Sequence, residues 1–455
     1  MKPTIQSSLL ITLFLTSSAF AQSFVMPKDL SDIERKRFER FQSFQIKGVC
    51  DDNDLDRLAK MGVNTVRGYT ISSPEAIREK LDHAQRLGMK MVVSEWMPHQ
   101  GKNKNGAGVV WDFDYNAKGD QMVKTFIKKV EAIGDHPAIL MWGLGNEVHL
   151  DEPYLSVVNR MSEEIHKRFP NHLTSLTMIN AKDTAIEAVK KFAPDIDVLG
   201  VQSYSVGAVS GAIKKTETLW GKPFYMSEFN TNGPWNFAKT EWGVALDEPV
   251  TKKVSDLKNC YAAIDASPLC LGSTIFVWGY DVADGSPTYF SLLLDPEPNG
   301  HPKMKSFDHL MITRQAEVMM EHFTGQPPKD NRAPVLSKLE FEGGAKSRLA
   351  KPGEPMPVRF AAIDPNGDKV EFVTWILDSS ARKTTRVAGP FPQTSPESTT
   401  INAPEKPGEY LLLVYAQDNK GGASAPLSRP SSPRGLAPPF IPITGHPGAD
   451  ASTSY

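Results

Sequence analysis

The feature that most constrains the fold is an alternation of short apolar runs with amphipathic segments between residues 44 and 323. The apolar runs are nearly continuous, which is typical of strands that are covered on both faces. The segments between them carry apolar residues at helical spacing. The expected strands are 44–50, 63–69, 89–96, 139–148, 173–180, 198–205, 223–230 and 271–281.

The segments between the strands carry helix start and stop signals. Pro74 stands at the first turn of one segment, where a missing backbone N–H is tolerated. Gly62 is placed to end another. The expected helices are 54–62, 74–88, 115–134, 153–169, 181–192, 208–220, 250–265 and 303–323.

The order of these elements predicts the fold class. Strands that alternate with helices form parallel sheets with right-handed crossovers. Eight such units predict an α/β chain with a closed (β/α)8 TIM barrel. The main alternative is an open, doubly wound sheet, which usually has a glycine-rich phosphate loop after its first strand. The segment "KGVCDDND" is not such a loop, so the barrel is the expected fold.

The composition changes after the barrel, for which we expect residues 22–325. Residues 326–334 are polar and rich in proline, as in a linker. Residues 335–428 contain strand-like runs separated by turns, which predicts a small all-β sandwich of the immunoglobulin-like kind. Residues 429–455 are rich in Pro, Gly and Ser, and we expect them to be disordered.

The N-terminus has the pattern of a signal peptide over residues 1–21. Lys2 precedes the apolar run "LLITLFL", and Ala19 and Ala21 form a small-residue cleavage site. We therefore expect export, to the periplasm or outside the cell. The apolar run is too short for a membrane span, and no later run is long enough either.

Charge and motif content argue against several partners and cofactors. The formal net charge is -2, with 51 basic and 53 acidic residues, so no nucleic-acid partner is expected. There is no HExxH or paired-Cys pattern, and we expect no metal and no cofactor. Cys260 and Cys270 are close enough in sequence to pair, but three buried thiols are an equally good interpretation. Nothing in the sequence sets the oligomeric state.

Candidate catalytic groups are found by considering only the strand ends, because barrel enzymes carry their active sites at the C-terminal ends of the strands. Glu147 ends the fourth expected strand and Glu228 ends the seventh. Two carboxyl groups at one barrel mouth suit the cleavage of a glycosidic bond, in which one donates a proton and the other attacks the sugar. Their mutual repulsion helps to keep one of them protonated near neutral pH.

Two motifs at these strand ends resemble a known family. "DHPAILMWGLGNE" resembles the strand-four motif of glycoside hydrolase family 2, and "PFYMSEFNTNGPW" resembles its strand-seven motif. The resemblance covers residues 44–323 and extends to the wider clan A. It implies a retaining mechanism, with Glu147 as acid/base and Glu228 as nucleophile.

The same resemblance implies roles for four further residues. Asn146 would bind the sugar 2-hydroxyl, and Arg67 would brace the nucleophile. Tyr204 would donate a hydrogen bond to the nucleophile, and Trp278 would form the floor of the site. All four lie at expected strand ends. Each also has a structural interpretation, as an ordinary barrel ion pair, polar group or core aromatic.

The sequence allows more than one role for two loop tryptophans and more than one substrate. Trp96 and Trp235 lie in or near loops at the expected mouth and are candidates for sugar contact or for loop packing. Family 2 enzymes typically carry β-domains before the barrel, and only a short segment precedes it here, so family substrate names do not transfer. A β-glucanosyltransferase on the same carboxyl pair and a non-catalytic carbohydrate-binding envelope protein are the alternatives. The expected partner in every case is a carbohydrate.

Overall fold

The computed structural model describes most of the two folded regions of the chain. The described residues are 24–99, 103–104, 110–111, 113–240, 243, 245–279, 289–294, 310–342, 347–378, 383–392, 398–424 and 427–433. The expected signal peptide, 1–21, lies outside this set, as do residues 434–455 of the expected tail, 429–455. By its contacts the chain divides into two compact units, one with residues 24–231 and 256–276 and one with 232–255 and 277–433. The expected domain limits at 325 and 335 stay predictions.

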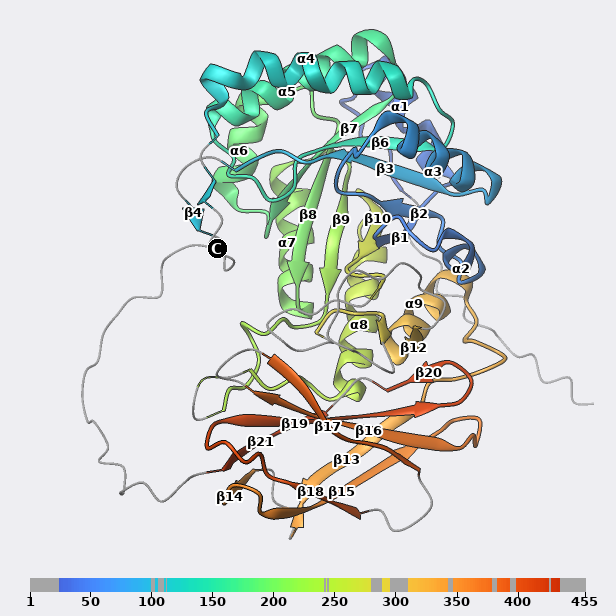
Figure 1. The fold of residues 1–455 in the computed structure, drawn as a ribbon. Helices are drawn as coiled ribbons and strands as arrows, with labels where there is room; N and C mark the ends of the chain where they lie inside the picture. The colour runs from blue at the N-terminus through green and yellow to red at the C-terminus, as the bar shows by residue number, and fades with distance from the viewer. Residues whose placement is uncertain are drawn as a thin grey trace, which may run out of the picture. The chain divides into compact units, whose positions relative to one another are not determined.

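Eight parallel strands close into a barrel, which confirms the expected fold (Figure 1). Neighbouring strands follow one another in chain order, and the last pairs with the first. The barrel strands are β1 (Ile46–Cys50), β2 (Thr65–Arg67), β3 (Lys90–Glu95), β6 (Ile139–Leu144), β7 (Leu173–Ile179), β8 (Val198–Tyr204), β9 (Phe224–Asn230) and β10 (Cys270–Ile275). They are almost wholly buried, because the side chains of both faces are covered.

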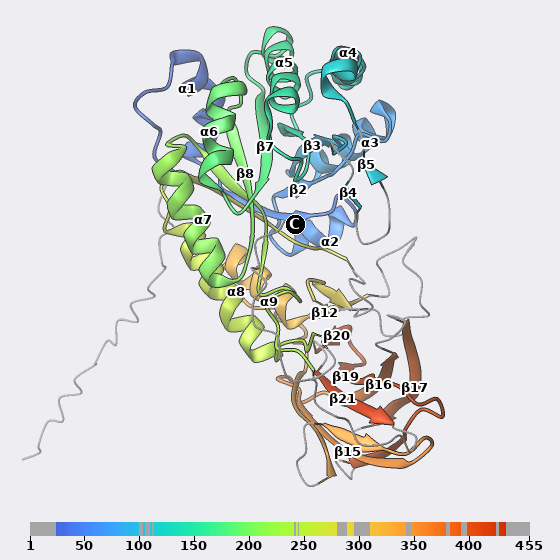
Figure 2. The ribbon, with the colours of Figure 1, turned by 90° about the vertical axis from the view of Figure 1, so that its left-hand side faces the viewer.

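A helix follows each of the first seven barrel strands, and the two views show these helices on the outside of the strands (Figures 1 and 2). Their starts follow the expected capping chemistry: Ser73 caps the helix that Pro74 begins, and Asp114 and Asp151 cap two others. The helices are α2 (Leu55–Lys60), α3 (Pro74–Arg86), α4 (Tyr115–Ile133), α5 (Glu152–Arg168), α6 (Asp183–Phe192), α7 (Val206–Leu219) and α8 (Val250–Asp265). A short hairpin of β4 (Asn103–Lys104) and β5 (Val110–Trp111) precedes α4.

The expected last helix at 303–323 differs from the structure. The described helix α9 covers Arg314–Thr324, and it is preceded by strand β12 (Met311–Thr313), which was expected to be helical. Thr313 ends the strand and caps the helix through its hydroxyl, which accepts from the Ala316 N–H. A cap residue has extended backbone angles, so the helix cannot extend back through it.

A segment that the sequence pattern did not predict as helical closes the N-terminal end of the barrel. It comprises α1 (Asp32–Phe38) and the 3-10 turn η1 (Glu39–Gln42). Phe38 and Phe41 are buried, and they join a hydrophobic cluster with residues from the first half of several barrel strands. The cluster members are Leu30, Phe38, Phe41, Ile46, Val92, Leu140, Met141, Leu173, Val198, Tyr225 and Leu271.

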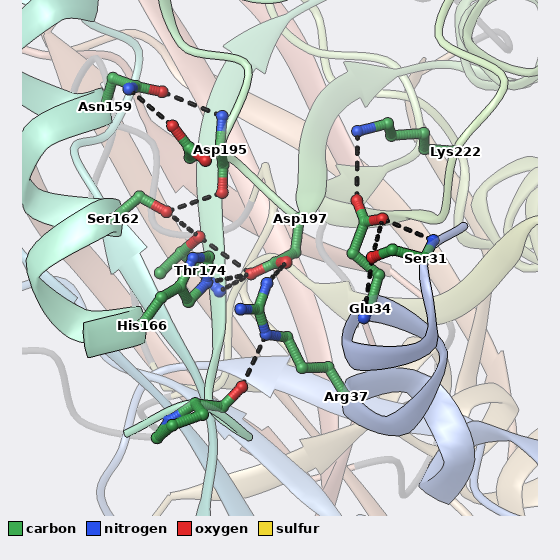
Figure 3. Close-up of polar contacts among 11 residues, drawn as sticks. Ser31, Glu34, Arg37, Asn159, Ser162, His166, Thr174, Asp195, Asp197 and Lys222 are labelled. Atoms are coloured by element: carbon green, nitrogen blue, oxygen red, sulfur yellow. Dashed lines mark hydrogen bonds and ion pairs between the residues drawn. The ribbon is translucent and has the colours of Figure 1, made fainter. Parts of the chain in front are cut away.

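A buried carboxylate ties α1 to this end of the barrel (Figure 3). Asp197 directly precedes β8 and is 5% exposed. It accepts hydrogen bonds from Arg37 of α1 at 2.8 Å and from the Thr174 N–H at 2.8 Å, and His166 Nε2 lies 2.9 Å from it. Buried charges need such partners, and here they connect α1, α5, β7 and β8.

Two β-sheets form the C-terminal region, as the sequence predicted. The larger has eight strands: six follow the path β11-β12-β20-β19-β16-β17, β21 also pairs with β19, and β14 pairs with β21. The smaller has the order β13-β15-β18. Their strands are β11 (Leu293–Leu294), β12, β13 (Val335–Phe341), β14 (Arg348–Ala350), β15 (Pro355–Ile363), β16 (Val370–Asp378), β17 (Lys383–Pro392), β18 (Ser398–Asn402), β19 (Tyr410–Asp418), β20 (Gly422–Ala423) and β21 (Leu427–Pro433). Both sheets contribute to one hydrophobic core, which includes Phe360, Phe372 and Val414. The immunoglobulin-like identity of this region stays a prediction.

Three further observations bear on the sequence predictions. Residues 427–433 form β21, which pairs with β19, so the expected disordered tail does not begin at 429. One edge of β19 pairs with β16, and the other pairs with this segment despite its prolines. Cys50, Cys260 and Cys270 are all buried free thiols, so the interpretation without a disulfide holds in this structure. Among the described residues, no helix is long and apolar enough to cross a membrane.

Candidate active site

The turn after β6 presents Asn146 and Glu147 at the end of the barrel wall. Gly145 begins the turn with a φ of 88°, and Glu147 itself has a φ of 56°. A Cβ atom on Gly145 would lie 2.2 Å from the Tyr154 hydroxyl, which donates to the Leu144 carbonyl. Only glycine therefore fits there. The left-handed backbone of Glu147 costs about 1–2 kcal/mol, and such strain is often found at functional sites.

Glu228 lies on β9 and is held by three donors. Its Oε1 accepts from Arg67 Nη1 at 2.8 Å and from the Tyr69 hydroxyl at 2.6 Å, while its Oε2 accepts from the Tyr204 hydroxyl at 2.8 Å. Burial raises the pKa values of both tyrosines well above their ordinary value, so both hydroxyls stay protonated donors. The carboxylate is thus fixed from both sides.

An irregularity in β9 helps to aim Glu228. The register of β9 shifts around Ser227 against both neighbours: Val201 pairs with Met226, but the next residue, Gln202, pairs with Glu228. Bulges of this kind re-aim side chains and are frequent beside active sites. The Ser227 carbonyl accepts from Arg67 Nη1 at 3.2 Å and from the Thr274 hydroxyl at 2.6 Å. The bulge therefore places both Glu228 and a backbone acceptor against Arg67.

Arg67 connects Glu228 on β9 with Asn146, the residue before Glu147. One nitrogen, Nη1, bonds Glu228, and the other, Nη2, donates to Asn146 Oδ1 at 2.6 Å. Its guanidinium lies 4.6 Å from the centroid of the Tyr69 ring, in a cation–π contact. The planar fork of arginine can serve two partners at fixed angles, which a lysine cannot do. Asn146 also accepts from Gln202 Nε2 of β8, at 2.8 Å.

The two glutamates have different environments. Burial and, to a lesser extent, the charge of Glu228 raise the pKa of Glu147 to about 7, against an opposing effect of Arg67. Glu228 instead receives three hydrogen bonds, one of them from a cation. Hydrogen bonds from donors favour the ionised form of a carboxyl group, and burial without a cationic partner favours the protonated form. The protonated form is therefore favoured at Glu147, whereas Glu228 is surrounded by donors.

The structure brings together most of the site residues that the sequence predicted. Arg67, Asn146, Tyr204 and Glu228 form one hydrogen-bonded network, and Glu147 interacts electrostatically with it. The roles assigned to these residues stay predictions.

The three tryptophans are placed as follows. Trp96 follows β3, is 39% exposed, and has its ring 6.5 Å from that of His99. Trp235 is 57% exposed and packs near Phe290 within the second unit. Trp278 is fully buried, but it lies beyond the end of β10, in the second unit, whereas the sequence placed it within the eighth strand. Their contact with substrate stays a prediction.

Sequence reasoning missed Tyr69 and Gln202. Tyr69 lies two residues after Arg67, and Gln202 lies two residues before Tyr204. Alternate residues of a strand share a face, so a search at a spacing of two from the predicted residues would have found both. Among the described residues there is no cluster of three or more His, Cys, Asp or Glu side chains that could hold a metal ion.

Comparison with known proteins gives distant likenesses only. No protein-family model matches the chain, and no curated protein does. Among solved structures, a β-glucuronidase from Bacteroides uniformis is 15% identical, with 86% of this chain and 46% of that chain covered and a TM-score of 0.46. A β-galacturonidase from Eisenbergiella tayi is 16% identical (64% and 52% covered, TM-score 0.43), and the GH53 catalytic domain of Ignisphaera aggregans is 12% identical (55% and 87%, TM-score 0.39). The chain spans about half the length of the first two. At these values the likeness does not extend to the reaction.

Proposed function

We propose that this protein is a retaining β-glycosidase that hydrolyses O-glycosidic bonds of oligo- or polysaccharides. The observation that carries the proposal is the division of the two glutamates at one barrel mouth. Burial holds Glu147 protonated up to a pKa of about 7, while Arg67 and two tyrosine hydroxyls bind Glu228 as a carboxylate. Glycoside hydrolysis needs one carboxyl group in each of these states.

In the first step, Glu228 attacks the anomeric carbon of the sugar. A bond forms between a carboxylate oxygen and that carbon, the bond from the carbon to the leaving oxygen breaks, and Glu147 gives its proton to the leaving oxygen. Oε1 of Glu228 already accepts two hydrogen bonds and Oε2 accepts one. Oε2 therefore keeps more lone-pair density for the attack.

In the second step, water releases the sugar from Glu228. Glu147 is now a carboxylate and takes a proton from the water. The water oxygen attacks the anomeric carbon, and the bond between that carbon and Glu228 breaks. Glu147 returns to its protonated state, and the sugar keeps its original anomeric configuration. Arg67, Tyr69 and Tyr204 hold Glu228 in place through both steps, because a nucleophile that is fixed in position reacts faster.

The test is the stereochemistry of the first product and the capture of the intermediate. A panel of aryl β-glycosides is screened for aryl alcohol release, and the first-formed sugar anomer is followed by proton NMR. A 2-deoxy-2-fluoro aryl glycoside of any accepted sugar should label the peptide that carries Glu228, as seen by mass spectrometry. Glu228→Gln should take up no label. An inverted product would contradict the retaining mechanism, and label on a residue other than Glu228 would contradict the assignment.

We also propose that the protein is exported after cleavage of residues 1–21. The basis is the sequence pattern of Lys2, the apolar run and the small residues Ala19 and Ala21. Expression of the full chain in a bacterium should give a mature protein that begins at Gln22. Edman sequencing of the periplasmic or medium fraction tests this, and retention of Met1 on protein in the cytosol would contradict it.

A further inference from the structure

We infer that Gln202 is a positioning residue that, together with Arg67, fixes the orientation of the Asn146 amide. In this orientation the NH2 group of Asn146 is the part left to face the sugar. The resemblance to glycoside hydrolase family 2 implies that Asn146 binds the sugar hydroxyl next to the anomeric carbon, and we infer that it does so only as a donor. The inference rests on the proposed glycosidase function and assigns a role to a residue that the proposed mechanism does not need.

Chemistry alone decides which atom of the Asn146 amide faces Arg67. The oxygen and nitrogen of an amide look alike in most structures, and their assignment depends on their partners. A guanidinium has five donors and no acceptor. The atom 2.6 Å from Arg67 Nη2 must therefore be the oxygen, Oδ1.

Gln202 reinforces the same orientation from the other side. Its Nε2 donates to Asn146 Oδ1 at 2.8 Å. Asn146 Oδ1 thus uses both of its lone pairs, one for Arg67 and one for Gln202. A flipped Asn146 would place its NH2 group against Arg67, and two donors would then face each other.

The backbone places Gln202 for this contact. The register shift in β9 brings Gln202 opposite Glu228, so the two residues share a register position on neighbouring strands. Gln202 is 1% exposed, so its side chain has little freedom to move away from Asn146. It comes from β8, Arg67 from β2, and Asn146 from the turn after β6. The three converge from separate barrel strands.

A purely structural role explains Gln202 poorly. Its Oε1 is buried and, among the described residues, has no hydrogen-bond donor. Burying an unsatisfied acceptor costs folding free energy, and an apolar side chain of the same length would avoid that cost. Within the described part of the chain, the side chain of Gln202 makes one hydrogen bond, to Asn146, and this bond accounts for the use of glutamine here.

The consequence concerns the sugar hydroxyl that the resemblance assigns to Asn146, next to the anomeric carbon. With both lone pairs of Oδ1 engaged, Asn146 has two N–H donors and no acceptor left for substrate. A sugar hydroxyl at that position can accept from Asn146, whereas a 2-deoxy sugar cannot. A site that is built to bond a hydroxyl rejects the analogue that lacks it. Loss of Gln202 should weaken this discrimination, since Asn146 is then held only by Arg67.

The test uses Gln202→Met, which keeps the length and removes the donor, with Gln202→Leu as a second variant in case the first misfolds. Each is assayed on an aryl β-glycoside of the accepted sugar and on its 2-deoxy analogue, with correction for uncatalysed hydrolysis. We expect kcat/KM to fall about tenfold or more on the hydroxylated substrate and less than about threefold on the deoxy substrate. In an Asn146→Ala background, the same change should have little further effect on either substrate.

The matched control is Ser203→Ala. Ser203 is the next residue on β8, and its hydroxyl donates to Asn180 Oδ1, on the other side of the strand from Gln202. This variant should leave the ratio of kcat/KM between the hydroxylated and the 2-deoxy substrate unchanged. If kcat/KM of the Gln202 variants falls equally on both substrates, Gln202 has a structural role only. If kcat/KM does not fall on either substrate, Gln202 does not position Asn146. Either result would overturn the inference. If the wild-type protein turns over neither substrate, the proposed function itself fails, and this inference fails with it.

Discussion

Arg67 and Glu228 form a buried ion pair, in which Nη1 lies 2.8 Å from Oε1 and the two side chains are only 1% and 5% exposed. Removing two charges from water is costly, and the attraction between them offsets this cost only when further hydrogen bonds complete the network. Here Tyr69, Tyr204 and Asn146 supply those bonds. Removal of either charged side chain alone is therefore strongly destabilising, because it leaves the other charge buried without its partner.

Loss of Arg67 alone should destabilise the protein strongly. Arg67→Met leaves the buried Glu228 without its cation, and we expect a loss of about 3–5 kcal/mol in the free energy of unfolding. Adding Glu228→Gln removes the unpaired charge and should restore a large part of that loss. Urea unfolding of both single variants and the double variant gives the coupling energy. Additive effects would show that the pair does not act as a unit.

The activity should decline as the pH rises above about 7. The proposed first step needs protonated Glu147, and burial raises its pKa to about 7. Above that value, kcat/KM should fall about tenfold per pH unit as the proton is lost. Glu147→Gln cannot donate a proton, so it should lower activity by about 10²- to 10⁴-fold on substrates with poor leaving groups and abolish this limb. If kcat/KM of Glu147→Gln still falls above pH 7, the fall must come from the titration of another group.

Tyr69→Phe should lower activity without unfolding the protein. The hydroxyl of Tyr69 donates to Glu228 Oε1 at 2.6 Å, and a hydrogen bond to a charged group contributes about 1.5–3 kcal/mol. We expect kcat/KM to fall about 10- to 100-fold, with the variant still fully folded at the assay temperature. The control is Tyr410→Phe, since that hydroxyl donates to the Lys406 carbonyl in the C-terminal sheets. Similar activity losses in the two variants would remove Tyr69 from the site.

Asp197→Ala should affect stability but not catalysis. Its carboxylate is buried at the N-terminal end of the barrel, where it bonds Arg37, His166 and Thr174. Removing it leaves the Arg37 charge without its partner, at a cost of about 3–5 kcal/mol. Measured well below its melting temperature, kcat/KM should match the wild type. A selective loss of kcat in fully folded protein would mean that this end of the barrel influences the active site.

The sequence predicts the barrel well, for a physical reason. Buried parallel strands give continuous apolar runs, and the topology then requires that the strand ends, such as Glu147 and Glu228, share one mouth. What the sequence does not give is the lateral contact between strands. Tyr69 and Gln202 act through Glu228 and Asn146, which are distant in the chain, and the β9 bulge that aligns Gln202 with Glu228 has no local signal.

Other differences have local causes. Helix α1 and the turn η1 are short, and their buried residues Phe38 and Phe41 stand in a segment dominated by charged residues, which hid its amphipathic character. Strand β21 contains Pro430 and Pro433, and proline is normally a sign of irregular chain. In both cases the tertiary partner, the barrel end or the edge of β19, determines the local structure.

The closure of the barrel by Phe38 and Phe41 also limits how the chain can be shortened. A fragment that starts at Ile46 would retain every residue of the carboxylate network, yet it would expose the apolar ring formed by Leu140, Leu173 and Val198 to water. Such a patch promotes self-association. Soluble expression of a chain that is shortened from its N-terminus therefore requires that the truncation site precede Leu30.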